Sequence, residues 1–318
     1  MADDERAETL AEMGEFVVID RLVLGRSHPA GVLVGPGDDA AVVTAPDGRV
    51  VVSTDMLVEG RHFRLDWSTP HDVGRKAIAQ NAADVEAMGA TATSFVVGFG
   101  APGATLGADA EALSDGLWAE ATTFGASIVG GDLVAAPQWV ISVTVLGDMQ
   151  GRPAVLLSGA RPGHTVAVVG DLGRSAAGYA LWRNAINDFA ELRRRHLVPA
   201  VPYGQGRVAA DAGATAMTDV SDGLLADLRH VADASAVGID LSRNALGADR
   251  DAVASAAAAT GEDPWGLVLG GGEDHALVAT FPGAVPDGWR EIGVVIEGPP
   301  RVLVDGAEWT GQGGWRSF

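Results

Sequence analysis

The stretch VGPGDDAAVVTAPDGRVVVSTDMLVEGRH, residues 34–62, joins an acidic glycine turn, a short apolar strand and a polar loop. Its first part, Gly35 to Asp39, is expected to be a tight turn, because two glycines and a proline oppose helical geometry. The run Val50 to Val52 is expected to be a buried strand that ends on the hydroxyl and carboxylate side chains of residues 53–55. Oxygen ligands at a strand end beside an acidic turn suit a hard cation.

Carboxylates next to glycine or hydroxyl residues recur along the chain, in sequence that is otherwise rich in Ala, Val and Leu. They occur at Asn81-Ala82-Ala83-Asp84, Gly130-Gly131-Asp132, Thr218-Asp219-Val220-Ser221-Asp222-Gly223 and Gly270-Gly271-Gly272-Glu273-Asp274. Removing a carboxylate from water is costly unless a positive partner meets it. Because Lys and Arg are scarce near these motifs, we expect divalent metal ions to supply the positive charge.

The composition is typical of a compact globular protein with two domains. A chain of 318 residues can hold two domains of ordinary size, and 47% hydrophobic residues argue against disorder. The turn-rich segment 147–163 places the expected boundary near residue 151, giving an N-terminal domain over 1–150 and a C-terminal domain over 151–318. The absence of cysteine excludes disulfides and thiolate chemistry. Without a membrane-length apolar run or a signal-like N-terminus, the protein is expected to be cytoplasmic.

The net charge of −20 limits the possible partners. It disfavours nucleic acid and anionic membranes, because both would be repelled. A phosphorylated substrate would be repelled too, unless Mg²⁺ bridges protein carboxylates and phosphate oxygens. Lys76 is the only lysine and lies in Gly74-Arg75-Lys76-Ala77, which excludes a Walker-type phosphate loop.

Helical and strand patterns in both halves indicate an α/β or α+β fold. Helices are expected at 5–24, 71–89, 108–124, 175–187, 205–212, 224–236 and 249–259. Strands are expected at 40–44, 50–55, 94–100, 127–129, 139–146, 164–169, 239–241 and 276–281, with a late pair at 292–296 and 301–304. Asn81 and Asp84 are three residues apart in the second helix, so both side chains can point toward a common site.

Six motifs occur in an order that resembles the thiamine-monophosphate kinase family, part of the superfamily of ATP-dependent enzymes that includes aminoimidazole ribonucleotide synthetase. They are Gly37-Asp38-Asp39-Ala40, Ser53-Thr54-Asp55 with Gly60-Arg61-His62-Phe63, Lys76-Ala77 with Asn81-Ala82-Ala83-Asp84 and Ala87-Met88-Gly89-Ala90, Gly130-Gly131-Asp132, Ser221-Asp222-Gly223-Leu224 and Gly271-Gly272-Glu273-Asp274. The resemblance implies a two-domain aminoimidazole ribonucleotide synthetase-like fold. In it, the N-terminal α/β domain binds metal and ATP, and its sheet pairs across a homodimer. The C-terminal α/β domain closes the active site.

The resemblance also implies transfer of the γ-phosphoryl group of ATP onto thiamine monophosphate, giving thiamine diphosphate, with several Mg²⁺ ions. The metal shell carried over is Asp39, Ser53, Thr54, Asp55, Asp84, Asp132, Asp219 and Asp222. The ATP side carried over is Gly131, Asp132 and Ser221, and the thiamine-phosphate side is His62, Glu273 and Trp315. Where relatives place an arginine on ATP this chain has Leu157, so either Arg152 or Arg161 is expected to replace that arginine, or the contact is absent here.

Phosphoryl transfer between two anions depends on alignment and charge neutralisation more than on covalent help. We therefore hypothesise that Asp55, Asp84, Asp132 and Asp219 hold the ions that bridge the substrates, and that transfer is direct, without a phosphoenzyme. Taken singly, each motif also has a structural explanation as a turn or a helix cap. Three alternatives stay open: a related ATP-dependent ligase, a non-catalytic Mg²⁺-nucleotide or thiamine diphosphate-binding protein, and an acidic Ca²⁺-stabilised structural protein.

Overall fold

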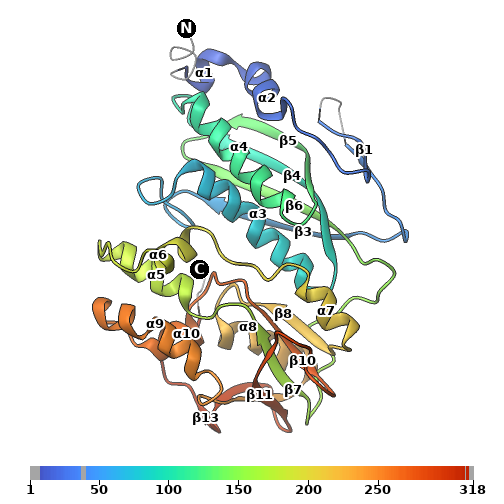
Figure 1. Cartoon of the computed structure of the whole chain (residues 1–318), viewed down its shortest axis with the longest axis vertical. Coiled ribbons are helices and arrows are strands. Elements are labelled where there is room, and N and C mark those ends of the chain that lie inside the picture. Colours follow the sequence, from blue (N-terminus) through green and yellow to red (C-terminus); the bar gives the residue numbers. More distant parts are fainter. Residues whose placement is uncertain (1–7, 37–40, 312, 315–318) are drawn as a thin grey trace. The chain divides into compact units, whose positions relative to one another are not determined.

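The computed structural model describes residues 8–36, 41–311 and 313–314, without the side chains of residues 15 and 16. The chain divides into two compact units (Figure 1). The first holds the chain up to Val85 together with Ala92–Gln150, and the second holds Glu86–Thr91 together with the chain from Gly151. The short segment 86–91 groups with the second unit because the Glu86 carboxylate accepts hydrogen bonds from the backbone N–H groups of Gly204 and Gly206.

The first unit is built on a four-stranded sheet with the order β3-β6-β4-β5. Its strands are β3 (Val51–Val58), β4 (Thr91–Ala101), β5 (Ser127–Ala135) and β6 (Val140–Asp148). β3 pairs antiparallel with β6, and β4 pairs parallel with β5. The helices α3 (Pro70–Ala87) and α4 (Gly107–Thr122) cover one face of this sheet (Figure 1). The elements that precede β3 are α1 (Leu10–Met13), α2 (Glu15–Val23), β1 (Val32–Val34) and β2 (Val42–Val43).

Side chains alternate between the two faces of β3, as the pleat of a strand requires. Ser53 and Asp55 face α3, to which both are hydrogen-bonded. Val52 and Met56 face the other side and are 63% and 51% exposed. The uncovered face of the sheet is apolar, with exposed side chains at Val52, Met56, Val96 and Val134.

The second unit is built on a seven-stranded sheet with the order β13-β12-β9-β11-β7-β10-β8. In chain order the strands are β7 (Thr165–Val169), β8 (Ala216–Asp219), β9 (Gly238–Leu241), β10 (Leu277–Phe281), β11 (Arg290–Ile296), β12 (Arg301–Val304) and β13 (Ala307–Glu308). β9 and β12 pair in parallel, whereas the other pairs given for this sheet are antiparallel.

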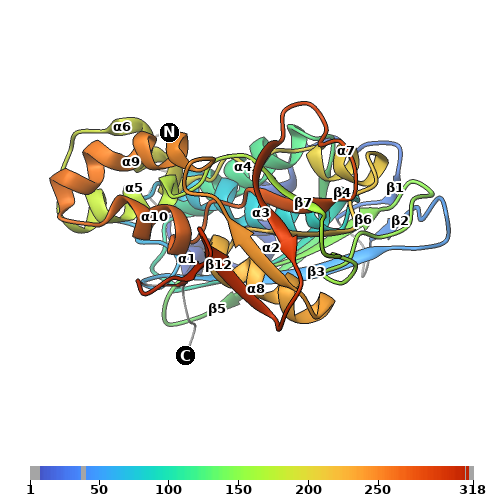
Figure 2. The same cartoon turned by 90° about the horizontal axis from the view of Figure 1, so that it is seen from below.

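Helices lie on both faces of this second sheet. They are α5 (Arg174–Arg183), α6 (Ala190–Leu197), α7 (Gln205–Asp211), α8 (Leu224–Ser235), α9 (Gly247–Thr260) and α10 (Pro264–Gly270). The main core packs apolar side chains of α5, α8, α9 and α10 against the sheet, and α5, α6, α9 and α10 gather together (Figure 2). A smaller core joins Ala209 of α7 to Met217, Phe281 and Trp289. In the part of the chain that the structure describes, no helix is both long and apolar enough to span a membrane.

Most expected helices are confirmed with shifted ends, but two N-terminal predictions are wrong. The helix expected over 5–24 is interrupted, because Gly14 has a φ of 77° between α1 and α2 and so leaves the helical region. The strand expected to end at 53–55 continues to Val58, and its first residues are not buried. Val50 is 47% exposed, because β3 is an edge strand with one uncovered face.

Other corrections concern glycine-rich and short segments. Gly130-Gly131-Asp132 lies inside β5 and not in a turn: a Cβ at Gly131 would stand 2.2 Å from the Val97 carbonyl oxygen, so this glycine permits the close approach of β4. Asp219 ends β8 instead of lying in a loop. No boundaries were predicted for α6 or α10, which are short and rich in Arg or Gly. The strands expected at 292–296 and 301–304 do not pair with each other, because β9 lies between β11 and β12.

Candidate active site

A row of polar side chains on α3 faces β3. Asp84 Oδ2 accepts a hydrogen bond from the Ser53 hydroxyl at 2.6 Å, and Asn81 Oδ1 accepts one from the backbone N–H of Asp55 at 3.0 Å. Gln80 Nε2 donates to Asp55 Oδ2 at 3.4 Å. The prediction that Asn81 and Asp84 point the same way is confirmed, because positions three and four apart share one side of a helix. The structure brings Ser53, Asp55 and Asp84 together.

His62 lies on the turn after β3, and its own side chain closes that turn. The backbone N–H of Val58 donates to His62 Nδ1 at 3.0 Å, and the N–H of His62 donates to the Val58 carbonyl at 3.0 Å. Because Nδ1 is an acceptor here, the neutral imidazole carries its proton on Nε2. His62 is exposed to solvent.

Two of the expected ligands in this unit lie on the opposite face of the sheet. Thr54 alternates with Ser53 and Asp55, and its hydroxyl donates to the Val143 carbonyl at 2.9 Å. Asp132 lies two residues before the exposed Val134 of β5 and therefore shares its face. The structure does not bring Thr54 and Asp132 to the side that carries Asp55 and Asp84.

In the second unit, acidic side chains crowd at the end of β8. Asp219 Oδ2 and His275 Nδ1 are 2.9 Å apart, and both residues are buried. Asp227 Oδ2 accepts the backbone N–H groups of Asp222 at 3.1 Å and Gly223 at 3.0 Å. Burial, followed by the carboxylates of Asp219 and Asp222, raises the pKa of Asp227 to about 8. Burial and the Asp219 carboxylate also raise the pKa of Asp222. A divalent cation would relieve this crowding.

The Ser221 and Glu273 motifs lie side by side. The backbone N–H of Glu273 donates to the Ser221 carbonyl at 2.7 Å, and that of His275 donates to the Val220 carbonyl at 2.8 Å. Glu273 and His275 have φ values of 64° and 52°, in the left-handed region that costs roughly 1–2 kcal/mol for a residue with a Cβ. His196 Nδ1 of α6 lies 3.4 Å from Glu273 Oε2. Backbone strain of this kind is concentrated at functional sites.

The carboxylate of Asp274 holds this loop against the start of α5. Its carboxylate accepts the backbone N–H groups of Gly173 at 2.5 Å and Ser175 at 2.8 Å, at the start of α5. Burial raises the pKa of Asp274 to about 7, although these two hydrogen bonds act in the opposite direction. Asp274 is 3% exposed, so its role is to hold the loop and not to meet a ligand.

Of three further expected site residues, one is already paired with another side chain and two lie outside the described residues. Arg152 Nε lies 2.6 Å from Asp211 Oδ1, and this hydrogen bond lowers the pKa of Asp211. A contact between Arg152 and ATP would compete with that ion pair. Asp39 and Trp315 lie outside the described residues.

The donor chemistry fits magnesium. The expected ligands are carboxylate and hydroxyl oxygens, with Asp55 and Asp84 paired in one unit and Asp219 and Asp222 in the other. Within residues 8–36, 41–311 and 313–314, no group of three or more Asp, Glu or His side chains could hold a metal ion. Mg²⁺ commonly binds through one or two carboxylates and takes its remaining ligands from water and substrate phosphates. The residues therefore suit Mg²⁺ that arrives with phosphorylated substrates.

Sequence reasoning assigned no role to several residues that support the site: Gln80, His196, Asp227 and His275. One sequence pattern could have indicated Gln80, since Lys76, Gln80 and Asp84 are spaced by four residues in an alanine-rich helix. Asp227 also follows Gly223 at the spacing of a residue that reaches back to the helix start. His196 had no such signal, because its contact with Glu273 joins distant parts of the chain.

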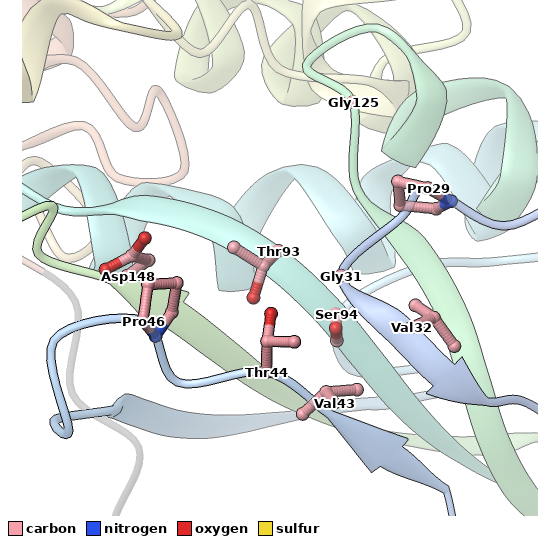
Figure 3. A pocket seen from close by; sticks show the side chains of 10 residues that line it. All are labelled: Pro29, Gly31, Val32, Val43, Thr44, Pro46, Thr93, Ser94, Gly125 and Asp148. Carbon is pink, nitrogen blue, oxygen red and sulfur yellow. The ribbon is translucent and has the colours of Figure 1, made fainter.

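A cavity of about 150 Å³ in the first unit is separate from these residues (Figure 3). It lies beside β2 and the start of β4 and is lined by Pro29, Gly31, Val32, Val43, Thr44, Pro46, Thr93, Ser94, Gly125 and Asp148. None of the expected site residues is among them, so we do not assign this cavity to the site.

The sequence matches two family models in the order of the two units. Residues 37–149 match the N-terminal domain of AIR synthase related proteins, and residues 161–304 match the C-terminal domain of the same proteins. A solved structure of the hydrogenase maturation protein HypE shares the fold at 19% identity. Its TM-score is 0.68, and the match covers 90% of this chain and 93% of that chain. The fold and site thus define a two-domain protein of the AIR synthase related class.

The chain belongs to the thiamine-monophosphate kinase family within that class. It is 71% identical to the thiamine-monophosphate kinase of Mycobacterium tuberculosis H37Rv, over 98% of this chain and 93% of the relative. Identity to the Corynebacterium glutamicum enzyme is 42%, over 98% and 95%. The structure of AaThiL complexed with AMPPCP and TMP is 31% identical with a TM-score of 0.78, and covers 96% of this chain and 98% of that chain. The resemblance found in the sequence motifs is confirmed.

Proposed function

We propose that this protein phosphorylates thiamine monophosphate, with ATP as the donor, to give thiamine diphosphate. The observation that carries the proposal is the 71% identity to the Mycobacterium tuberculosis kinase over 98% of the chain. The solved relative at 31% identity is complexed with TMP and with AMPPCP, an ATP analogue that stands in for the phosphoryl donor. We place the reaction in the cytoplasm, where ATP is available.

The reaction joins two anions in a protein whose net charge is −20, so positive charge is required at the site. Mg²⁺, when bound, would supply positive charge to offset the charge of the phosphates. Asp55 and Asp84 would hold it in the first unit, and Asp219 and Asp222 in the second. Asn81 and Gln80 fix the backbone and carboxylate of Asp55 in advance, which reduces reorganisation when substrates bind.

The remaining site residues divide between the two substrates. Gly131, Asp132 and Ser221 are assigned to ATP, and His62, Glu273 and Trp315 to the acceptor. The acceptor phosphate is already ionised near neutral pH, so it needs no general base to become a nucleophile. Transfer is therefore direct and in line, without a covalent phosphoenzyme.

The protein acts as a homodimer that buries the uncovered face of the first sheet. Val52 and Met56 are 63% and 51% exposed there, and Val134 is 52% exposed. Contiguous apolar side chains on one face favour association. β3 and β5 are the edge strands of this sheet and carry Thr54 and Asp132 on the same face, at its borders.

A direct assay tests the activity. The purified protein is given ATP with thiamine, thiamine monophosphate or an aminoimidazole precursor in separate reactions, each with and without Mg²⁺. We expect thiamine diphosphate only from thiamine monophosphate with Mg²⁺. Turnover of the aminoimidazole precursor would favour the ligase instead, and nucleotide binding without turnover would favour a non-catalytic protein. Asp55→Asn should abolish turnover and keep the fold. The exposed Asp251→Asn is the charge-matched control.

The direct mechanism has its own test. The protein is incubated with ATP labelled in the γ-phosphoryl group, without an acceptor, and is then denatured. We expect no label on the protein. A labelled protein that passes its phosphoryl group to thiamine monophosphate would overturn direct transfer.

A further inference from the structure

Asp227 is a buried carboxylate in the first turns of α8 that the proposed function does not use. It is 4% exposed, and its Oδ2 accepts the backbone N–H groups of Asp222 at 3.1 Å and Gly223 at 3.0 Å. Gly223 is the residue that precedes α8, and a side chain that reaches back to this N–H is a common helix cap. The hydrogen bond to Asp222 lies one residue further out, so Asp227 does more than cap the helix.

The two hydrogen bonds fix both peptide groups that flank the Cα atom of Asp222. The N–H of Asp222 belongs to the peptide group before this Cα atom, and the N–H of Gly223 belongs to the one after it. Because peptide groups are planar, fixing both of them also fixes the direction of the Cα–Cβ bond between them. The first peptide group is held at its other end too, since the Ser221 carbonyl accepts the N–H of Glu273 at 2.7 Å.

The turn needs such support because glycine follows Asp222. Gly223 has a φ of 121°, in a region that is open to glycine, and a glycine can leave this conformation for many others at little cost. Asp227 is well placed to select one of them, because α8 is anchored in the main core. Leu224 and Leu228, on either side of Asp227, are 0% and 1% exposed.

We infer that Asp227 is a positioning residue that acts through Asp222: it holds both peptide groups of this turn so that the Asp222 carboxylate is oriented for Mg²⁺ before the ion arrives. The inference rests on the proposed function, in which Asp222 is a metal ligand. Residues that orient metal ligands commonly change metal affinity by roughly 10–100-fold when they are replaced. The role requires an oxygen that accepts two hydrogen bonds and does not require a negative charge.

Binding of Mn²⁺ tests the inference, because Mn²⁺ prefers the same oxygen ligands as Mg²⁺ and its free form is measured by electron paramagnetic resonance. The parent, Asp222→Asn, Asp227→Leu and the double variant are titrated with Mn²⁺ in the presence of a non-hydrolysable ATP analogue. Asp222→Asn identifies the ions that depend on this carboxylate. We expect Asp227→Leu to raise their dissociation constant by roughly tenfold or more. In the Asp222→Asn background it should have little further effect.

Two further variants separate positioning from metal ligation and from helix capping. Asp227→Asn keeps an oxygen that can accept both N–H groups, so its Mn²⁺ affinity should stay close to that of the parent. Asp263→Leu removes a carboxylate that caps α10 by accepting the N–H groups of Trp265 and Gly266. It should lower the thermal unfolding temperature without changing Mn²⁺ affinity.

Several outcomes would overturn the inference. They are additive losses in the cycle, equal losses in Asp227→Leu and Asp227→Asn, or a loss in Asp263→Leu as large as that in Asp227→Leu. If Asp227→Leu does not fold, Asp227→Ala takes its place, and a large loss of affinity in Asp227→Asn contradicts the inference whether or not either one folds. If Asp222→Asn binds Mn²⁺ as the parent does, Asp222 is not a ligand and the inference fails with it.

The proposed function fails in a different way. The titration needs no turnover, so a parent that binds Mn²⁺ but does not phosphorylate thiamine monophosphate overturns the proposed function alone. The cycle between Asp222 and Asp227 then still decides whether Asp227 orients a metal ligand.

Discussion

Ser53 donates its hydroxyl hydrogen to the carboxylate of Asp84 across 2.6 Å, although the two residues are 31 positions apart in the sequence. The distance is typical of a hydroxyl bound to a carboxylate. It joins the edge strand β3 to the last turn of α3 and sets the orientation of Asp84. Two residues expected to be metal ligands therefore support each other before any ion binds.

Replacing Asp84 by Asn should weaken magnesium binding without unfolding the protein. The amide oxygen of Asn can still accept from Ser53, but the negative charge is lost. We expect the Mg²⁺ concentration for half-maximal activity to rise by at least roughly tenfold. Activity is titrated with Mg²⁺ for the parent, Asp84→Asn and the exposed control Asp251→Asn. The assignment of Asp84 as a ligand fails if all three curves coincide.

Asn81 is expected to matter for stability as well as for the site. It is 0% exposed, and its side chain accepts from the N–H of Asp55 and donates to the Ala77 carbonyl. Asn81→Ala leaves the N–H of Asp55 without this acceptor, which should lower the free energy of unfolding by about 1–3 kcal/mol. Urea denaturation measures the change, with the exposed Asn187→Ala as the matched control. Equal midpoints for the two variants would contradict this account.

The neighbouring glycines of β5 should respond differently to the same substitution. A Cβ at Gly131 would stand 2.2 Å from the Val97 carbonyl oxygen, whereas a Cβ at Gly130 meets nothing within 4 Å. We expect Gly131→Ala to destabilise the protein by roughly 1–3 kcal/mol or more, because β4 and β5 must separate. Gly130→Ala should stay within about 1 kcal/mol of the parent. Thermal unfolding of the two variants measures the change. Similar losses of stability would mean that β4 and β5 do not approach each other this closely at Gly131.

Asp274 should make stability fall as the pH rises. Burial raises its pKa from 3.8 to about 7 in the folded protein, so between these values the folded state holds a proton that the unfolded state has released. The contribution is complete below about pH 4 and is lost as the pH rises through 7. Its slope approaches roughly 1.4 kcal/mol per pH unit.

The comparison of Asp274→Asn with the parent isolates this effect. The variant loses one backbone hydrogen bond at every pH, but it has no carboxyl group to titrate. Urea denaturation across the window should therefore give a shallower pH dependence for the variant, and the difference should stop changing above the upper pKa. Parallel curves for the two proteins would show that Asp274 ionises normally.

Local sequence was sufficient to predict which side chains share a face where a pattern repeats within one helix. Asn81 and Asp84 were expected on one side of a helix, and the structure places both toward β3. The motifs around Ser221 and Glu273 were recognised separately as polar glycine loops. Their hydrogen bond, between the N–H of Glu273 and the Ser221 carbonyl, was not expected, because it joins segments on different elements.

The geometry of the strands explains why the expected set of site residues included some that lie on the opposite face of the sheet. The motif Ser53-Thr54-Asp55 was treated as one cluster at a strand end. Because β3 continues to Val58, the pleat sends Thr54 to the face opposite Ser53 and Asp55. Asp132 was expected in a turn and lies inside β5 instead. Whether the aspartates of the two units meet around shared ions stays a prediction.

By itself the sequence determined the acidic character, the absence of thiol chemistry, most helices and the family, because these depend on composition, local periodicity and ordered motifs. The tertiary structure determined which face each carboxylate occupies, which backbone groups bind Asp227 and Asp274, and that Lys76 is buried. Those outcomes depend on hydrogen bonds and packing between residues far apart in the chain, and the environment so created sets the burial and the pKa of each group.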